Sequence, residues 1–162
     1  MPFGKDEILR FLGEFGIDYT LFEHEAVFTA EEALTVCGHI PGVHCKNLFL
    51  KDKADALWLV TLPDEKRADL KSLPEKIGSN RLSFGNAALL METLGVTPGS
   101  VTPLALINDE AARVQPVVDR GMMEQDLINL HPLVNTATIT LRTADLMRFF
   151  TALRRKPLLA AL

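Results

Sequence analysis

The apolar positions in the first quarter of the chain predict a helix, a strand and a second helix. Residues 6–15 carry apolar side chains three and four positions apart, and Gly16 follows where a helix commonly ends. The short run at residues 18–23 then favours a strand. Residues 29–32 read Thr-Ala-Glu-Glu, the pattern of a capping box, so a short helix should begin there and end near Gly38.

The middle of the chain predicts a β-hairpin followed by an interrupted helix. Two β-favouring runs, residues 45–51 and 56–62, flank a polar connection. Residues 66–77 have a helical pattern in which Pro74 should open a new turn. Residues 80–84 then predict a short strand.

The next segment predicts a helix, an irregular loop and a pair of strands. Asn86 can cap an apolar helix that ends before Gly95. Residues 97–103 contain two prolines and a glycine, so we expect no regular structure there. Residues 104–108 and 113–118 are apolar runs around a polar turn, which favours two paired strands.

The C-terminal quarter predicts two further strands, at residues 127–130 and 136–141, and a helix capped by Thr143. Helices and strands do not alternate as in a doubly wound sheet. We therefore predict an α+β fold with a mixed, strongly curved central β-sheet and flanking helices. The length of 162 residues, without a linker or a repeat, predicts a single domain over residues 1–162.

Composition narrows the class of protein. Hydrophobic residues make up 48% and charged residues 23%, which is typical of a globular chain and excludes a disordered one. We expect a cytoplasmic protein with no membrane contact, because neither a leader-like segment nor a bilayer-length apolar run occurs. Cys37 and Cys45 should therefore be free thiols. The net charge of -4 argues against a broad nucleic-acid-binding face, but allows a small basic mouth for one RNA end.

One lysine enters an apolar strand directly after a Pro-Gly turn. Residues 41–50 read PGVHCKNLFL, and Lys46 lies in their middle. A lysine near a low-dielectric surface can hold a phosphate or polarise a carbonyl group. A strand-edge lysine that prevents unwanted pairing fits the same pattern, and the spacing alone favours that simpler role.

Five segments spread along the chain carry a family resemblance. They are residues 24–29 (HEAVFT), 41–50, 81–84 (RLSF), 95–103 together with 106–109, and 131–138 (HPLVNTAT). In these segments the chain resembles the YbaK-like and PrdX-like aminoacyl-tRNA editing proteins, a family related to the insertion domain of bacterial prolyl-tRNA synthetases. The resemblance is greatest to the free-standing PrdX-like branch, whose members deacylate mischarged alanyl-tRNA for proline.

The resemblance implies hydrolysis of an aminoacyl ester at the 3′ end of a tRNA, with no metal, cofactor or covalent protein intermediate. Lys46 matches the family's essential lysine and should contact the terminal phosphate or the ester carbonyl. Near a phosphate its ammonium should stay protonated, so it should not act as a general base. Residues 99–103 match the family's glycine-x-x-x-proline loop, which implies that Gly99 and Ser100 line the site and that the loop orients water. By composition alone, a plain surface turn fits these residues.

His131 and Asn47 are the remaining polar candidates. His131 precedes a proline, which favours an extended conformation. It could face a water or the substrate's α-amine, or it could be a structural histidine, and its match to the family position favours function. Asn47 is a candidate substrate-binding residue, although in a strand its side chain should point away from the face of Lys46.

Selectivity would come from the size of the pocket. Val27, Phe28 and Ala33 are candidate walls that admit alanine and exclude proline by steric clash. Each of them could instead fill the core. The sequence does not determine the pocket volume, so the choice among alanine, cysteine and serine as the accepted amino acid stays open.

A zinc site is the rival interpretation of one cluster. Cys37, His39, His44 and Cys45 are the ligand types of a structural zinc site. Their spacing lacks the usual pairs two to four residues apart, and adjacent residues of an extended chain point in opposite directions. We therefore predict no metal.

These observations predict a trans-editing hydrolase that deacylates mischarged tRNA(Pro), with Ala-tRNA(Pro) as the preferred substrate. Its partner is the acceptor end of tRNA(Pro), and prolyl-tRNA synthetase is a candidate second partner. One alternative is a Cys-tRNA(Pro) deacylase. Another is a non-catalytic tRNA- or synthetase-binding module of the same fold.

Overall fold

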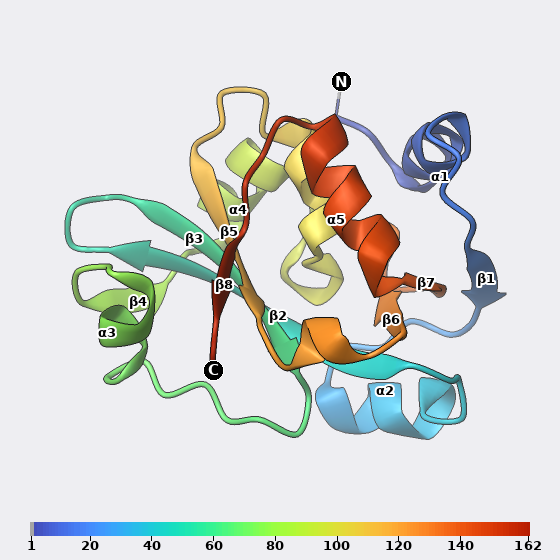
Figure 1. Cartoon of the computed structure of the whole chain (residues 1–162), viewed down its shortest axis with the longest axis horizontal. Helices are drawn as coiled ribbons and strands as arrows, with labels where there is room; N and C mark the ends of the chain where they lie inside the picture. Colours follow the sequence, from blue (N-terminus) through green and yellow to red (C-terminus); the bar gives the residue numbers. More distant parts are fainter. Residues whose placement is uncertain (1) are drawn as a thin grey trace.

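A computed structural model describes residues 2–162 of the chain (Figure 1). Its strands are β1 (Thr20–Glu23), β2 (Val43–Asp52), β3 (Leu57–Pro63), β4 (Leu82–Phe84), β5 (Val114–Asp119), β6 (Leu127–Leu130), β7 (Ala137–Arg142) and β8 (Leu158–Ala160). Its α-helices are α1 (Lys5–Glu14), α2 (Ala30–Cys37), α3 (Leu73–Ile77), α4 (Ala87–Leu94) and α5 (Thr143–Ala152). Three 3-10 helices are η1 (Pro98–Ser100), η2 (Pro103–Asn108) and η3 (Met122–Glu124).

One mixed sheet organises these elements. Its strand order is β1-β7-β6-β2-β3-β5-β8, and β4 pairs with the far end of β2. β2 is antiparallel to β3 and β4 but parallel to β6, while β5 runs parallel to both β3 and β8. Figure 1 shows the sheet curving around α5. The predicted α+β class with a mixed sheet and flanking helices is confirmed.

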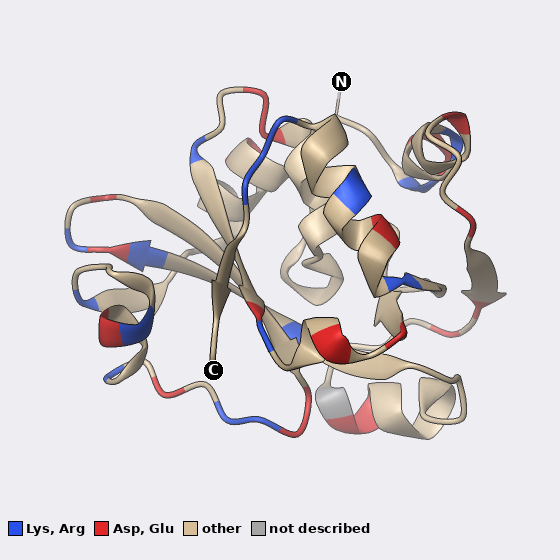
Figure 2. Cartoon of the chain, viewed as in Figure 1, with Lys and Arg blue, Asp and Glu red and all other residues tan. Residues whose placement is uncertain are grey.

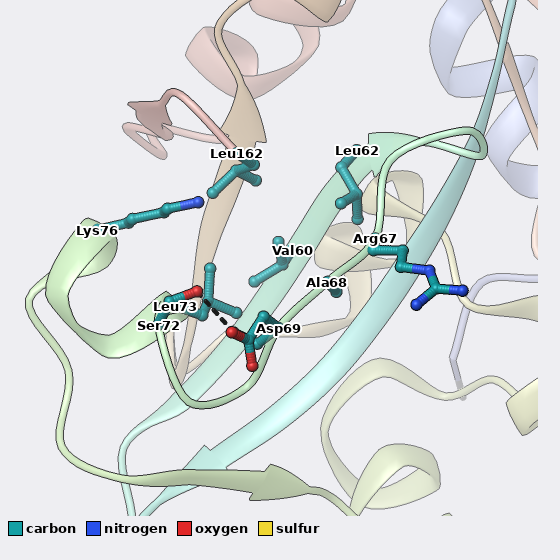
Figure 3. Close-up of a pocket in the computed structure, with 9 residues that line it drawn as sticks. All are labelled: Val60, Leu62, Arg67, Ala68, Asp69, Ser72, Leu73, Lys76 and Leu162. Carbon is teal, nitrogen blue, oxygen red and sulfur yellow. Dashed lines mark hydrogen bonds between the residues drawn. The ribbon is translucent and has the colours of Figure 1, made fainter.

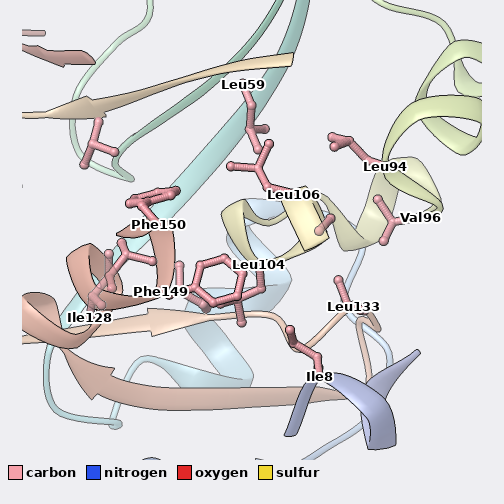
Figure 4. Close-up of a cluster of buried hydrophobic side chains, with 14 of the residues drawn as sticks. Ile8, Leu59, Leu94, Val96, Leu104, Leu106, Ile128, Leu133, Phe149 and Phe150 are labelled. Atoms are coloured by element: carbon pink, nitrogen blue, oxygen red, sulfur yellow. The ribbon is translucent and has the colours of Figure 1, made fainter. Parts of the chain in front are cut away.

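The larger hydrophobic cluster fills the concave side of the sheet. Phe149 and Phe150 of α5 are fully buried there, and their rings pack edge to face. Leu104 and Leu106 of η2 and Ile8 of α1 close the cluster from other sides (Figure 4). Helices that are distant in the sequence therefore meet on this one face.

A smaller hydrophobic cluster covers part of the opposite face, and it corrects one prediction. Residues 66–72 were expected to be helical, but the helix begins at Leu73. Figure 3 shows the preceding segment crossing the side chains of Val60 and Leu62 in an open path. The cavity left beneath it measures about 10 Å³, near the lower limit for a single water molecule.

The predicted caps of α2 and α4 form as expected. The Thr29 hydroxyl accepts the N–H of Glu32, while the Glu32 carboxylate reaches back to the N–H of Phe28. The Asn86 amide oxygen accepts the N–H of Leu89. These caps satisfy backbone donors that a helix start leaves without partners.

Other predictions were wrong at the level of single elements. Residues 104–108 form the 3-10 helix η2 rather than a strand, and Pro98 to Ser100 adopt a helical turn within the segment predicted to be irregular. β5 pairs with β3 and β8 instead. Thr143 does not cap α5: it is the first residue of that helix, and its hydroxyl donates to Gln125 O.

A buried ion pair joins η2, β5 and the chain after α5. The Asp109 carboxylate accepts the N–H groups of Arg113 and Val114 and lies 3.1 Å from the Arg155 guanidinium. The side chains of Asp109 and Arg155 are 2% and 10% exposed. The pair replaces the strand pairing that the sequence predicted around this turn.

Asp109→Ala should lower the free energy of unfolding by about 3–5 kcal/mol, because it leaves a buried guanidinium and two N–H groups without their acceptor. Urea unfolding measures the change. Glu110→Ala is the matched control, since its exposed neighbouring side chain should contribute less than about 0.5 kcal/mol. Equal stability of the two variants would contradict this role of the ion pair.

Candidate active site

The polar centre of the candidate site lies on β2 and just beyond β6. On one side of β2, Lys46 pairs with Leu62 of the antiparallel strand β3. On the other side, His44 pairs with Asn129 of the parallel strand β6. Lys46 lies two residues after His44 on β2, and His131 follows the last residue of β6. Because alternate residues of a strand share a face of the sheet, His44 and Lys46 project to the same side.

Asp64 follows β3 and lies beside Lys46. Its N–H donates to His44 O at 2.9 Å, and its own carbonyl oxygen is 3.5 Å from Lys46 Nζ. Burial raises the pKa of the Asp64 carboxyl, and the nearby charges of His44, Lys46 and His131 oppose that rise. The four groups therefore share one electrostatic environment.

His131 is held in one tautomer. Its Nδ1 lies 3.1 Å from Ala137 O, and a carbonyl oxygen can only accept, so Nδ1 carries the proton. Burial lowers the pKa of His131, and nearby His24 lowers it further, against opposing contributions from the Ala137 hydrogen bond and from Asp64. Nε2 of the neutral ring therefore remains as a hydrogen-bond acceptor.

A cleft of about 870 Å³ is lined by two of these groups, His44 and Asp64, but not by Lys46 or His131. Figure 1 shows α2 lying beneath β2 at this position. Its lining residues come from α2, from the start of β2 and the turn before it, from the chain after β3, and from the segment from β5 to β6. They include Glu31, Leu34, His44, Asp64, Glu65, Lys66, Asp119 and Met122. Its volume is sufficient for a ligand of small-molecule size.

The Gly99 loop forms a second part of the site. A Cβ atom on Gly99 would lie 3.2 Å from Asn135 Nδ2 and 3.4 Å from the ring of Phe28. Asn135 in turn donates its side-chain N–H to Val27 O. Ser100 is buried and, with Asn135, lines a pocket of about 320 Å³.

The loop of residues 131–136 links the two parts. His131 begins it beside the Lys46 group, and Asn135 lies near its end against Gly99. Within residues 2–162, no hydrogen bond joins Gly99 or Ser100 directly to Lys46. The structure thus gathers His44, Lys46 and His131 around Asp64, and holds the Gly99 loop at the other end of the same short connection.

The remaining predicted site residues lie in different environments. Asn47 accepts the Thr61 hydroxyl on the face opposite to Lys46, so this placement gives no support to a role in substrate binding. Val27 is buried, whereas Phe28 is 72% exposed and does not fill the core. Ala33 is half-buried on α2, one turn before Cys37.

Three of the four side chains that suggested zinc contact separate partners. Cys37 lies 3.8 Å from the Thr138 hydroxyl, while His44 and Cys45 donate to backbone carbonyls. Burial raises the pKa of the Cys45 thiol to about 12. Across the described residues 2–162, His, Cys, Asp and Glu form no group of three that could hold a metal ion.

Sequence reasoning missed two polar groups of this region. Asp64 belongs to none of the segments that carried the family resemblance, and an aspartate after a strand is typical of any turn. His24 lies within such a segment, and its Nε2 accepts the Thr138 hydroxyl at 2.9 Å. The family resemblance of residues 24–29 could have identified His24, whereas no sequence pattern around Asp64 identified that residue.

Comparison with known proteins identifies the class to which this fold and site belong. A family model for the aminoacyl-tRNA editing domain matches residues 24–149. The chain belongs to this family of aminoacyl-tRNA deacylases. No helix within residues 2–162 has the length and apolar character needed to cross a bilayer.

Relatives with assigned names support the same placement. The chain is 37% identical to prolyl-tRNA editing protein ProX of Acetoanaerobium sticklandii, over 91% of each chain. It is also 37% identical to prolyl-tRNA synthetase associated domain-containing protein 1 of Danio rerio, over 96% of this chain and 85% of the relative. The multifunctional Ser/Thr-tRNA deacylase ProXp-y of Escherichia coli is 27% identical, over 87% and 84%. The crystal structure of hypothetical protein APE2540 shares the fold, with a TM-score of 0.74 at 20% identity over 94% and 97% of the two chains.

Gly99→Ala should lower kcat/KM for aminoacyl-ester hydrolysis by about 10- to 100-fold, because the added methyl group displaces Asn135 and Phe28. Stability should change by less than about 1 kcal/mol, since both contacts involve side-chain atoms that can move. Gly13→Ala is the control, with no heavy atom within 4 Å of its Cβ. Unchanged activity of Gly99→Ala would contradict a role for this close approach.

Acid should destabilise the protein through His131. The unfolded imidazole takes up a proton near its ordinary pKa of 6.5, whereas the lowered pKa of the folded state resists protonation. The free energy of unfolding should therefore fall as the pH drops below the ordinary pKa of 6.5, by at most about 1.4 kcal/mol per pH unit. Urea unfolding of the wild type and of His131→Gln between about pH 5 and pH 8 isolates this contribution; parallel curves for the two proteins would contradict it.

Proposed function

We propose that this protein is a trans-editing hydrolase that removes a wrong amino acid from tRNA(Pro), with Ala-tRNA(Pro) as its preferred substrate. The observation that carries the proposal is the gathering of His44, Lys46 and His131 around Asp64, which lines a large cleft. The identity to the prolyl-tRNA editing protein ProX supports the choice of tRNA.

The proposed reaction is attack of water on an ester that is already activated. Water adds to the carbonyl carbon, the bond to the ribose oxygen breaks, and the products are a free amino acid and an uncharged 3′ end. Lys46 stabilises the oxyanion or holds the terminal phosphate, and the Gly99 loop orients the water through its main chain. Nε2 of His131 can accept a hydrogen bond from that water.

Small size is the proposed basis of selectivity. Ala33 and Val27 are the candidate walls of an amino-acid pocket that excludes proline by clash. Phe28 is not part of the pocket wall in this proposal. Its exposed ring, next to Gly99, offers a surface for contact with the RNA end.

Two other functions are compatible with the same residues. Hydrolysis of Cys-tRNA(Pro) needs a pocket that also admits a thiol, and the relative ProXp-y, named for Ser/Thr-tRNA, illustrates a different substrate choice in a similar chain. A binding module without turnover would need neither the Lys46 ammonium nor the His131 tautomer. Prolyl-tRNA synthetase is proposed only as a second binding partner, in addition to tRNA(Pro).

Lys46→Ala should lower kcat/KM for Ala-tRNA(Pro) by at least about 100-fold, because it removes the cation next to the reacting ester. Hydrolysis of alanyl-, cysteinyl- and prolyl-tRNA(Pro) is the measurement, with tRNA binding followed in parallel. Lys51→Ala is the control, since that lysine lies on the same strand but pairs with exposed Asp55.

Each outcome separates the candidate functions. Loss of the alanyl ester alone, dependent on Lys46, supports the proposal, and preference for the cysteinyl ester moves the protein to the sister activity. Equal rates of the wild type and Lys46→Ala would refute the assignment of Lys46. Absence of turnover of every ester, with retained binding, would favour the binding module.

A further inference from the structure

Asp64 has a carboxylate in the cleft that the fold itself does not use. The backbone of Asp64 is fixed by His44 and Lys46, as described above. Its carboxylate oxygens, by contrast, have no hydrogen bond or ion pair within residues 2–162. A half-buried carboxylate without a partner is costly, unless a ligand supplies the partner.

The other carboxylates of the cleft differ from Asp64. Asp119 is fully buried, but it pairs with Lys66 at 3.1 Å and accepts the N–H groups of Met122 and Leu162. Glu31 and Glu65 are exposed, so water solvates them. Figure 2 shows acidic residues on the two ribbons that flank the cleft, at the start of α2 and after β3. Asp64 is the one among these four that is both partly desolvated and unpaired.

The groups that face Asp64 explain what it can bind. His44 and Lys46 come from β2, and His131 comes from the chain after β6. Despite these neighbours, burial keeps the pKa of the Asp64 carboxyl above its ordinary value, so none of them neutralises it fully. A small cation entering the cleft would complete this arrangement.

We propose that Asp64 binds the protonated α-amino group of the aminoacyl ester. This inference rests on the proposed function, because such an ester carries an ammonium group on the carbon next to the reacting carbonyl. The Lys46 ammonium, placed at that carbonyl, repels the α-ammonium, and the charge of the Asp64 carboxylate, which interacts with that of Lys46, offsets the repulsion. Asp64 is thus a substrate-binding residue that orients the ester with respect to Lys46.

The arrangement gives a specific chemical selectivity. Acetylation of the α-amine removes its charge and adds bulk, so an N-acetyl aminoacyl ester should be a poor substrate. A charge-assisted hydrogen bond of this kind is worth about 10- to 100-fold in binding. The side chain of the bound amino acid does not enter this step, so the selectivity should apply equally to alanyl and cysteinyl esters.

The test compares free and N-acetylated substrates. Hydrolysis of Ala-tRNA(Pro) and N-acetyl-Ala-tRNA(Pro) is measured for the wild type, Asp64→Asn and Glu65→Gln. Binding of 3′-alanylamino-3′-deoxyadenosine and its N-acetyl form, in which an amide replaces the ester, gives a readout independent of turnover. Asp64→Asn keeps the size of the side chain and both backbone contacts of Asp64, and a thermal melt checks that the variant folds.

We expect the wild type and Glu65→Gln to prefer the free amine by about 10-fold or more, and Asp64→Asn to lose most of that preference in both assays. A preference retained by Asp64→Asn would overturn the inference while leaving the hydrolase standing. A preference lost in His131→Gln but kept in Asp64→Asn would assign the amine to the imidazole instead. If the wild type neither hydrolyses the ester nor binds the analogue, the proposed function fails and this inference fails with it.

Discussion

The parallel pairing of β2 with β6 is the constraint on which the candidate site depends. Two residue pairs define it, and they lie directly before Lys46. The amide of Asn129 secures this pairing: its N–H groups donate to Pro41 O and Val43 O, and its oxygen accepts the Thr140 hydroxyl. A slip by one residue would turn Lys46 to the opposite face of the sheet. A buried polar network at this position therefore fixes which side chains reach the cleft.

Close backbone approach makes the turn before β2 part of the same constraint. Gly42 has a φ of 105°, and a Cβ there would lie 3.0 Å from Leu127 Cβ and 3.1 Å from Asn129 Nδ2. Only glycine adopts this conformation readily and leaves room for β6. The pleat of β2 then divides its residues: Phe49 packs into the larger cluster, and Leu48 packs against the smaller one. Lys46 shares the face of Leu48, and its Nζ lies 3.5 Å from the backbone oxygen of Asp64, a residue that lines the cleft.

Sequence patterns predicted the local structure well and the long-range structure poorly. The caps at Thr29 and Asn86 involve residues three positions apart, and both formed as predicted. The strand pairing predicted for residues 104–108 was wrong, because the buried Asp109–Arg155 ion pair and the prolines of this region favour a 3-10 helix. The parallel pairing of β5 with β8 has no local signal, since its partners lie about 40 residues apart.

The same division applies to the candidate site. The family resemblance selected Lys46, Gly99 and His131, and their roles stay predictions, although Lys46 and His131 are both neighbours of Asp64. Asp64 could not be selected, because its environment depends on burial and on three titratable neighbours from two other segments. Asn47 shows the converse: simple alternation along a strand was enough to predict that it faces away from Lys46.

The acidic balance of the chain is consistent with a site that works by local charge. A net charge of -4 provides little long-range attraction for a polyanion, so affinity for the body of a tRNA should be modest and sensitive to salt. At the edge of the cleft, however, partial burial of Asp64 reduces solvent screening of its charge, and Lys46 Nζ lies 3.5 Å from the Asp64 backbone oxygen. An aminoacyl ester presents the complementary charges over a few atoms, a cationic amine and a carbonyl that becomes anionic during attack. The proposed function therefore asks the groups around Asp64 to recognise that short dipolar group rather than a long phosphate backbone.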